Sequence, residues 1–284
     1  MRKETKNLIK LYYVLMTVVL LFIAGFIFYY FQPKDLSLII LDVGQGDAVL
    51  IITPDKLKVL IDGGPDNSVL YRLGRYLPFY DRRLDLVILT HPHADHIVGL
   101  VEVLKRYKVK KVLLPTSVCK NSECVALAEI IKEKNINFEI VNHRRNFWLG
   151  KTVALAMVNP SSNQSDKKNI NNDSIVAKLF FGRTKAWLMG DFEQEEKLVK
   201  EKMNLKSEII KIGHHGSNTA NSLEFLQLVK AKFAAISVGL DNKFNHPHPG
   251  TLKNLEKIGV QVFQTDLAGD LFFSSDGESY SVRP

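Results

Sequence analysis

The segment LDLVILTHPHADH (residues 84–96) constrains the fold of this 284-residue chain more than any other feature. Its apolar half is typical of a strand buried on both faces, and it ends directly at three histidines and an aspartate. His91 and His93 are separated by one residue, so in an extended segment both rings point to the same side and suit one metal ion. Asp95 and His96 follow at the start of a helix, where they would turn to a second ion. Imidazole and carboxylate together suit zinc or manganese.

Four further histidines lie in two later clusters, His214 and His215 in GHHGS and His246 and His248 in NHPHPG. The first cluster directly follows a predicted strand, and the second follows a loop after one. Strand ends that share one edge of a sheet meet in space, so ligands from these distant segments would gather near His91. The pair at 246 and 248 fits an ordinary turn before a helix equally well.

Short apolar runs separated by turns predict the rest of the fold. Strands are expected at residues 36–41, 48–52, 57–61, 84–89, 111–114, 140–141, 153–158, 175–181, 186–189, 209–212, 233–238, 260–263, 271–273 and 280–282. Helices are expected at residues 68–77, 97–104, 122–134, 192–203, 221–229 and 250–258. Residues 160–172 are polar and are expected to form a mobile loop. This order of strands and helices predicts two sheets with helices outside, a four-layer α/β/β/α sandwich.

A charge-free apolar run, Leu11–Phe31, sets the first 34 residues apart. At ~1.5 Å per residue a helix of this length spans ~31 Å, about one bilayer core. Basic residues are concentrated in the first ten positions, so the N-terminus is expected in the cytoplasm and residues 35–284 outside it. A cleavable signal peptide is the alternative. Bulky aromatic residues end the run instead of small ones, which favours an uncleaved, single-pass anchor in the cell membrane.

The chain has a formal net charge of +8 and two cysteines. A basic surface attracts polyanions such as nucleic acid or anionic lipid, although a small excess like this one is common in soluble domains. No second cysteine or histidine pair accompanies Cys119 and Cys124, so the spacing is not a zinc motif. In an exported domain the two would form a small disulfide loop, and two free thiols are the alternative.

Taken together, the motifs resemble a known family. HPHADH (residues 91–96) looks like the signature of the metallo-β-lactamase superfamily. Five further motifs resemble the hydrolase domain of ComEC-type competence proteins, which act in DNA uptake: LDVGQGDAVLI at 41–51, VLIDGG at 59–64, NNDSIV at 171–176, LMGD at 188–191 and KIGHHGS at 211–217. Their order and spacing cover nearly the whole chain after residue 37. The resemblance implies that residues 35–284 form the hydrolase domain.

The resemblance also implies the metal ligands. His91 and His93 would bind the first ion, Asp95 and His96 would bind the second, and Asp191 would bridge both. The metals implied are two divalent ions, zinc or manganese.

The remaining polar residues of the motifs receive supporting roles. His215 would complete the second metal site, and His214 would contact phosphate. The reverse assignment stays open, since adjacent residues at a strand end point in opposite directions. Asp62 would orient a ligand histidine. The GQGD segment itself indicates a tight backbone turn near the metals, with Asp47 close behind them, and a simple hairpin turn is the alternative.

Two departures from the family pattern stand out. The superfamily often has another histidine ligand between His96 and Asp191, where this chain has only His143, beside two arginines, in a setting typical of a surface residue. Asn172 and its neighbours fill that place, as in the ComEC-like branch, so the first metal would be weakly held or would bind only with substrate. ComEC-type transporters also have many membrane spans. With one expected span, this chain is not expected to form the DNA channel.

A two-metal site would lower the pKa of a shared water from ~15.7 towards ~7, and the hydroxide would attack a phosphorus or a carbonyl carbon. Asp95, Asp191 and His214 are the protein groups expected to act in this reaction. Alternatively, the two aspartates are plain ligands. The candidates to hold a substrate phosphate are Asn172, Ser174, Lys211, Ser217 and His246. Lys211 would otherwise be an exposed strand residue and Ser217 a helix cap.

These features favour a membrane-anchored, metal-dependent phosphodiesterase, a nuclease acting on DNA. A hydrolase of another phosphoester, such as a wall or lipid headgroup phosphodiester, is the first alternative. Hydrolysis of an amide, a thioester or a β-lactam is the second, and the missing histidine argues against it. The third is a non-catalytic module that only binds DNA at the membrane, against which the intact ligand set argues.

Overall fold

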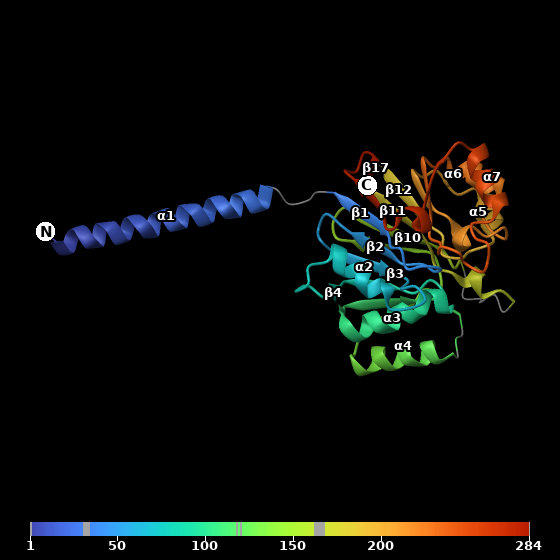
Figure 1. Cartoon of the computed structure of the whole chain (residues 1–284), viewed down its shortest axis with the longest axis horizontal. Coiled ribbons are helices and arrows are strands. Elements are labelled where there is room, and N and C mark those ends of the chain that lie inside the picture. Colours follow the sequence, from blue (N-terminus) through green and yellow to red (C-terminus); the bar gives the residue numbers. More distant parts are fainter. Residues whose placement is uncertain (1, 31–34, 118, 120, 162–167, 284) are drawn as a thin grey trace. The chain divides into compact units, whose positions relative to one another are not determined.

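The computed structural model describes residues 2–30, 35–117, 119, 121–161 and 168–283. Its contacts divide the chain into two compact units, Met1–Lys34 and Asp35–Pro284. The first unit contains one helix, α1 (Arg2–Tyr30), drawn in dark blue in Figure 1. Within α1, Thr5–Phe26 is long and apolar enough to cross a membrane, with a mean hydropathy of 2.2.

The second unit is built from two large sheets and one short strand pair. Its first ten strands in the chain are β1 (Leu36–Ile40), β2 (Val49–Ile52), β3 (Lys58–Ile61), β4 (Arg83–Leu84), β5 (Leu86–Ile88), β6 (Lys108–Val109), β7 (Lys111–Leu114), β8 (Asn137–Ile140), β9 (Arg145–Leu149) and β10 (Val153–Asn159). The remaining strands are β11 (Val176–Phe181), β12 (Thr184–Leu188), β13 (Ile209–Lys211), β14 (Phe233–Ile236), β15 (Gln261–Gln264), β16 (Leu271–Ser275) and β17 (Tyr280–Arg283).

Helices connect these strands. The α-helices are α2 (Ser68–Tyr76), α3 (Ala94–Arg106), α4 (Ser122–Glu133), α5 (Glu195–Lys200), α6 (Leu223–Val229), α7 (Pro249–Lys257) and α8 (Thr265–Ala268). Two short 3₁₀ helices are η1 (Ile170–Asp173) and η2 (Gly213–Gly216).

The strand order explains the layers. One sheet has eight strands in the order β17-β16-β1-β2-β3-β5-β7-β8, and the other has seven in the order β15-β14-β13-β12-β11-β10-β9. In Figure 1, α2, α3 and α4 lie on one side of the sheets and α5, α6 and α7 on the other. The predicted four-layer α/β/β/α sandwich is therefore confirmed.

Apolar side chains on both faces of the strands hold the layers together. In β1, Leu38 and Ile40 belong to the core between the two sheets, and the intervening Ile39 belongs to the core under α2 and α3. A third core joins the second sheet to α5, α6 and α7, and includes Trp187 and Phe225. Burial on both faces explains why these strands read as continuous apolar runs.

Several elements differ from the sequence predictions, among them the short β6 and α8, which were not predicted. β9 was not predicted, because it is an edge strand with alternating exposed residues and charged or aromatic side chains. The predicted strand at 84–89 is divided at Asp85, whose backbone N–H bonds to the carbonyl oxygen of Lys58. The predicted helix at 192–203 is limited to α5. Part of the loop expected at 160–172, residues 162–167, lies outside the described residues.

Cys119 and Cys124 are joined by a disulfide, the first of the two alternatives considered for them. Asn121, inside this small loop, accepts the N–H of Cys124 and so caps α4. Its side-chain amide also lies 3.5 Å from the carbonyl oxygen of Pro92. The disulfide loop therefore lies next to the histidine segment.

Candidate metal centre

Segments that follow the carboxyl ends of strands in both sheets bring the predicted ligands together. β5 leads into His91 and His93, and α3 begins directly after them. β12 leads into Asp191, and β13 leads through η2 into His215. β12, β13 and β14 are parallel, as are β3 and β5, so the segments after them share one edge of each sheet.

His91, His93 and Asp191 form a first group of metal-binding side chains, with one ligand atom of each within 4.8 Å of the others. Nε2 of His91 is 3.0 Å from Nδ1 of His93 and 3.7 Å from Oδ2 of Asp191. His91 and Asp191 are buried, and His93 is half-buried. Three convergent donors fit an ion that keeps open positions for water or substrate.

Asp95, His96, Asp191 and His215 form a second group under the same 4.8 Å limit. Nε2 of His96 is 3.3 Å from Oδ2 of Asp191, and Nε2 of His215 is 3.6 Å from the same oxygen. Oδ2 of Asp95 is 3.2 Å from Nε2 of His215. Asp191 therefore belongs to both groups, as a bridging carboxylate must.

Buried carboxylate and carbonyl oxygens hold the ligand histidines from behind. Oδ2 of Asp62 is 2.9 Å from Nδ1 of His96, and the N–H and hydroxyl of Thr90 donate to the Asp62 carboxylate at 2.8 and 2.7 Å. Nδ1 of His215 is 2.9 Å from the carbonyl oxygen of Ser237. Donation from Nδ1 leaves Nε2 of each ring free to bind a metal.

The unpaired atoms of the site provide a direct test of whether it suits a metal. Within the described part of the chain, Nε2 of His96, Nε2 of His215 and Oδ1 of Asp191 are buried and have no hydrogen-bond partner. Buried polar atoms are almost always paired. A divalent cation between these atoms would satisfy them, so the donor set fits a metal centre.

Burial and mutual charge shift the pKa values of these residues in opposite directions. Burial lowers the pKa of His91 well below its ordinary value, and the nearby His96 adds to the effect. Burial opposes ionisation of Asp191, but the attraction of His215 and His96 outweighs it and holds the Asp191 pKa far below normal. Burial likewise opposes protonation of His215, but Asp191 and Asp47 raise its pKa to about 10. The carboxylates of Asp191 and Asp47 therefore stabilise positive charge on or between the rings. That charge is supplied either by protons on the imidazoles or by a metal ion that displaces those protons.

The GQGD turn packs directly against the second ligand group. The backbone N–H of Asp47 donates to the carbonyl oxygen of Asp95 at 3.1 Å. A Cβ atom on Gly46 would lie 2.3 Å from that same oxygen, so the approach needs glycine. Oδ1 of Asp47 is 3.3 Å from Nδ1 of His215. The turn therefore packs against the second ligand group, and Asp47 lies next to the far side of the His215 ring.

The two adjacent histidines of η2 do not point in opposite directions, which corrects the geometry expected from the sequence. His214 and His215 both have left-handed backbones, with φ of 47° and 51°. Nε2 of His214 is 3.8 Å from Oδ2 of Asp191, so both rings approach the same carboxylate. His215 is buried in the second group, while the side chain of His214 is 24% exposed. His214 therefore lies at the open side of the centre.

Two of the predicted substrate contacts are buried behind the centre. Lys211 is buried, its Nζ forms an ion pair with Asp47, and it donates to the carbonyl oxygen of Ile212 at 3.2 Å. Ser174 is also buried, with its Oγ 3.3 Å from Nδ1 of His91. Neither side chain has access to a substrate phosphate. Sequence reasoning did not foresee this, because both partners come from distant segments.

Of the other three predicted contacts, Asn172 and His246 are half-buried and Ser217 is buried. Ser217 is largely buried and accepts the N–H of Thr219 at 3.2 Å, so it stabilises the turn after η2. Oδ1 of Asn172 accepts the N–H of Glu193 at 3.3 Å. The ring of His246 is 5.6 Å from that of His214, and burial lowers its pKa to about 4. His246 and Asn172 thus border the open side, whereas Ser217 has a local structural role.

Glu193 is a site residue that sequence reasoning missed. Its Oε1 is 2.7 Å from Nδ1 of His214 and accepts hydrogen bonds from Asn171 at 3.0 Å and Thr219 at 2.9 Å. The carboxylate fixes the His214 ring, so that Nε2 faces the metal groups. In the sequence, Glu193 stands among several acidic residues after Asp191, and nothing distinguishes it from a solvated surface charge.

The fold and ligand pattern correspond to a described family. The model of the metallo-β-lactamase superfamily matches residues 41–126, which include His91, His93, Asp95 and His96. The chain carries a metallo-β-lactamase domain. The crystal structure of the metallo-β-lactamase fold protein YhfI from Bacillus subtilis has the same fold, with a TM-score of 0.58 and 13% sequence identity over 85% of this chain and 100% of that one.

Two curated relatives connect this metallo-β-lactamase domain to competence proteins. ComE operon protein 3 of Bacillus subtilis is 30% identical over 265 residues, which are 86% of this chain and 34% of the relative. Competence protein ComA of Neisseria gonorrhoeae is 29% identical over 268 residues, 89% of this chain and 35% of the relative. The resemblance to ComEC-type competence proteins is thus confirmed. The chain spans about a third of the length of these relatives.

Proposed function

We propose that this chain is a membrane-anchored, metal-dependent phosphodiesterase that acts on DNA outside the cytoplasm. The observation that carries the proposal is the pair of ligand groups that share Asp191. The choice of DNA rests on the relatives, one of which is named a competence protein, and on the basic composition. Basic proteins bind polyanions through their phosphates.

Each ligand group would hold one ion. His91, His93 and Asp191 would bind the first, and Asp95, His96 and His215 would bind the second together with Asp191. Zinc or manganese, when bound, supplies Lewis-acid activation of water and of the phosphoryl group. The protein orients the donors, since Asp62 and Ser237 hold the far ring nitrogens of His96 and His215.

The residues at the open side would bind the phosphate. Glu193 holds Nδ1 of His214, so Nε2 of that ring is directed toward the metal groups and would donate to a phosphate oxygen. His246 lies next to this ring and would contact the same group. Asn172 accepts the backbone N–H of Glu193 and therefore lies beside the same open side.

The anchor would be α1. Thr5–Phe26 satisfies the length and hydropathy of a membrane span, and the basic residues before it favour a cytoplasmic N-terminus. An exported domain also agrees with the Cys119–Cys124 disulfide, because disulfides persist outside the cytoplasm.

A substrate panel tests this function. The full chain in detergent, with zinc or manganese added, is expected to cleave DNA and bis-p-nitrophenyl phosphate and to leave nitrocefin intact. His93→Ala is expected to lose both phosphodiesterase activities. His143→Ala is the matched control, because this histidine is exposed and bonds only locally, to Asn142.

The panel also separates the alternatives. Cleavage of bis-p-nitrophenyl phosphate but not of DNA would indicate a smaller phosphoester as substrate. Nitrocefin hydrolysis would indicate amide chemistry. DNA binding without cleavage, undiminished in His93→Ala, would indicate a binding module and would refute the proposed activity.

The two histidines of η2 are expected to respond differently to alanine substitution. His215→Ala should lower the bound metal from about two ions to about one, because its Nε2 is a ligand of the second group. His214→Ala should keep both ions and lower the phosphodiesterase rate by about 10²-fold, a typical loss for a positioned side chain. Elemental analysis together with initial rates measures both effects. The reverse pattern would make His214 the ligand.

A further inference from the structure

The edge of the first sheet that lies at the opposite strand ends from His91 carries a set of exposed aromatic and basic side chains. We call it the distal edge and define it as residues 53–58, 78–86 and 106–111 with the start of β1. The strand registers place these segments side by side, with Ser37 opposite Ile52 and Ile52 opposite Lys58. Val59 pairs with Leu86, and β4 pairs with β6. His91 and His93 follow the other end of β5, which is one of these strands. Four residues of β3 at ~3.3 Å each span ~13 Å between its two ends.

Two aromatic rings project from the distal edge into solvent. Phe79 is 86% exposed and Tyr80 is 78% exposed. Their rings pack on each other, with centroids 5.3 Å apart in an edge-to-face arrangement. Single exposed apolar residues are common, but two adjacent large rings at the tip of one loop mark an interaction surface.

The loop that carries these rings is held in place by its neighbours. Lys58 forms an ion pair with Asp81, and the N–H of Lys108 donates to the carbonyl oxygen of Arg82 at 2.8 Å. Buried Leu77 and Leu84 fill the core on either side of the loop. Leu77 and Leu84 already anchor this loop in the core, so the rings of Phe79 and Tyr80 remain outside the core and in solvent.

The surroundings of the rings are basic. The exposed cationic side chains nearby are Lys56, Arg82, Arg83, Arg106, Lys108 and Lys110. Asp81 pairs with Arg83 and Glu102 pairs with Arg106, and the distal edge also carries the exposed Asp55 and the half-buried Asp85, so part of this charge is offset. Beside Phe79, a groove of about 390 Å³ is lined by Tyr71, Arg82 and Arg106 among others. Aromatic rings flanked by arginine and lysine are typical of protein surfaces at the headgroup level of a bilayer.

The covalent connection to α1 favours a membrane as the partner. α1 ends at Tyr30 and β1 begins at Leu36, so five residues, 31–35, join them. A chain of that length reaches at most about 20 Å, whatever the orientation of the two units. If α1 spans a bilayer, the start of β1 stays within that distance of the helix end. The start of β1 belongs to the distal edge, which carries the rings.

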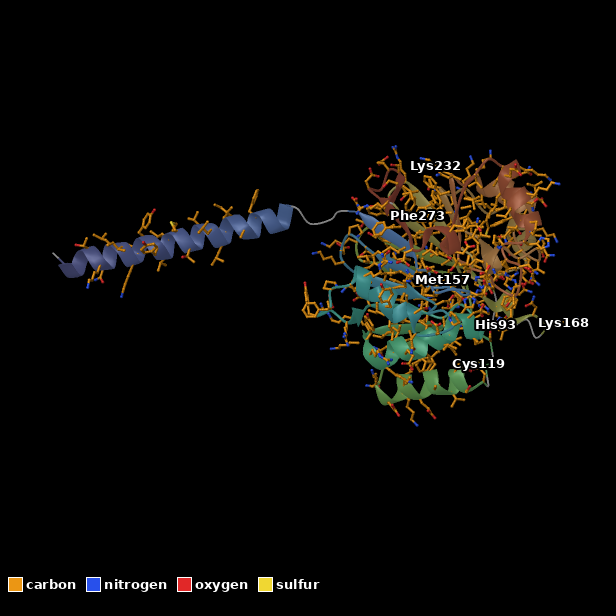
Figure 2. The ribbon with its side chains drawn as sticks, in the orientation of Figure 1. His93, Cys119, Met157, Lys168, Lys232 and Phe273 are labelled. Atoms are coloured by element: carbon orange, nitrogen blue, oxygen red, sulfur yellow. A yellow bond between two sulfur atoms is a disulfide. The ribbon has the colours of Figure 1, made fainter. Side chains whose placement is uncertain are left out.

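We propose that the distal edge is a membrane-facing surface, with Phe79 and Tyr80 in the interfacial layer and Arg82 and Arg106 against anionic lipid phosphates. The inference rests on the proposed anchoring by α1 and goes beyond it. It orients the metal centre away from the bilayer, where a polymeric substrate has access. Figure 2 labels His93, in the first ligand group, and Lys232, which directly precedes β14. The two lie well apart, so the metal groups and the start of this strand of the second sheet are at different ends of the domain. Single-stranded nucleic acid also stacks on exposed aromatics, but here the rings lie at the opposite strand ends from the metal groups.

Tryptophan quenching in nanodiscs tests this orientation. The full chain with Trp148→Phe and Phe79→Trp is reconstituted in discs of phosphatidylcholine and phosphatidylglycerol, with and without brominated acyl chains. The emission of the buried Trp187, measured in Trp148→Phe alone, is subtracted. Phe244→Trp in the same background is the matched control, since Phe244 is 53% exposed and stands next to His246 at the metal side. Brominated lipid is expected to quench the tryptophan at position 79 by about twofold and to leave the one at 244 unchanged, because only the former reaches the interface.

Each other outcome overturns the inference. Equal or absent quenching at both positions in discs that retain the protein refutes the membrane-facing edge and leaves the anchor intact. Quenching at position 79 by a single-stranded oligonucleotide, with none by brominated lipid, makes the edge a nucleic-acid surface. Protein that does not remain with the discs refutes the anchor together with this inference.

Discussion

Replacing Asp191 with asparagine is expected to lower the phosphodiesterase rate by about 10³-fold or more and to reduce the bound metal to at most one ion per chain. Asp191 is the one residue present in both ligand groups, and its Oδ2 lies within 3.8 Å of ring nitrogens of His91, His96 and His215. An amide keeps the shape of the carboxylate but removes its charge. A loss of ~4 kcal/mol of transition-state stabilisation corresponds to ~10³ in rate.

The matched control for this variant is Asp173→Asn. Asp173 is also buried, but its carboxylate accepts a hydrogen bond from Ser117 at 2.9 Å and belongs to neither ligand group. Its rate is expected to stay within about tenfold of the parent, since Asp173 is a member of neither ligand group. An Asp191→Asn protein that retains two ions and most of its rate would contradict the bridging role.

Replacing Lys211 with methionine is expected to destabilise the domain by about 3–5 kcal/mol, the usual cost of breaking a buried ion pair from one side. Lys211 and Asp47 are both almost completely buried; Lys211 ends β13, and Asp47 lies in the turn between β1 and β2. Without the ammonium group, the Asp47 carboxylate would remain in the interior without its cation. Urea unfolding of the full chain in detergent measures the loss.

Two further variants separate this effect from a general loss of packing. Lys185→Met, on the neighbouring strand β12 but only half-buried, is expected to cost at most ~1 kcal/mol. Lys211→Met combined with Asp47→Leu is expected to recover much of the stability, because no unpaired charge is left. An unfolding free energy unchanged in Lys211→Met, with a raised KM for bis-p-nitrophenyl phosphate, would instead support the substrate contact expected from the sequence.

The layers and the principal ligand segment were predictable because each depends on local pattern. Strands buried on both faces, such as β3, read as short apolar runs, and the ligands of HPHADH lie at the end of one of them. β9 escaped prediction because an edge strand that alternates Asn146, Phe147 and Trp148 has no continuous apolar signal.

The finer geometry of the site was not predictable because it depends on contacts between distant segments. The burial of Lys211 depends on Asp47 from the distant turn between β1 and β2, and Ser174 packs against His91. On an extended strand the rings of His214 and His215 would point to opposite sides. Their left-handed backbones instead bring both rings close to the Asp191 carboxylate. Glu193 gains its role only when Thr219 and His214 fold next to it.

Anomalous diffraction from crystals of the full chain grown with zinc or manganese shows whether two metal ions share Asp191. The proposed centre requires two peaks on either side of the Asp191 carboxylate, each about 2.0–2.2 Å from its ligand atoms. The first would contact His91 and His93, and the second Asp95, His96 and His215. A metal bound away from Asp191, or crystals without any peak among these residues, would contradict it.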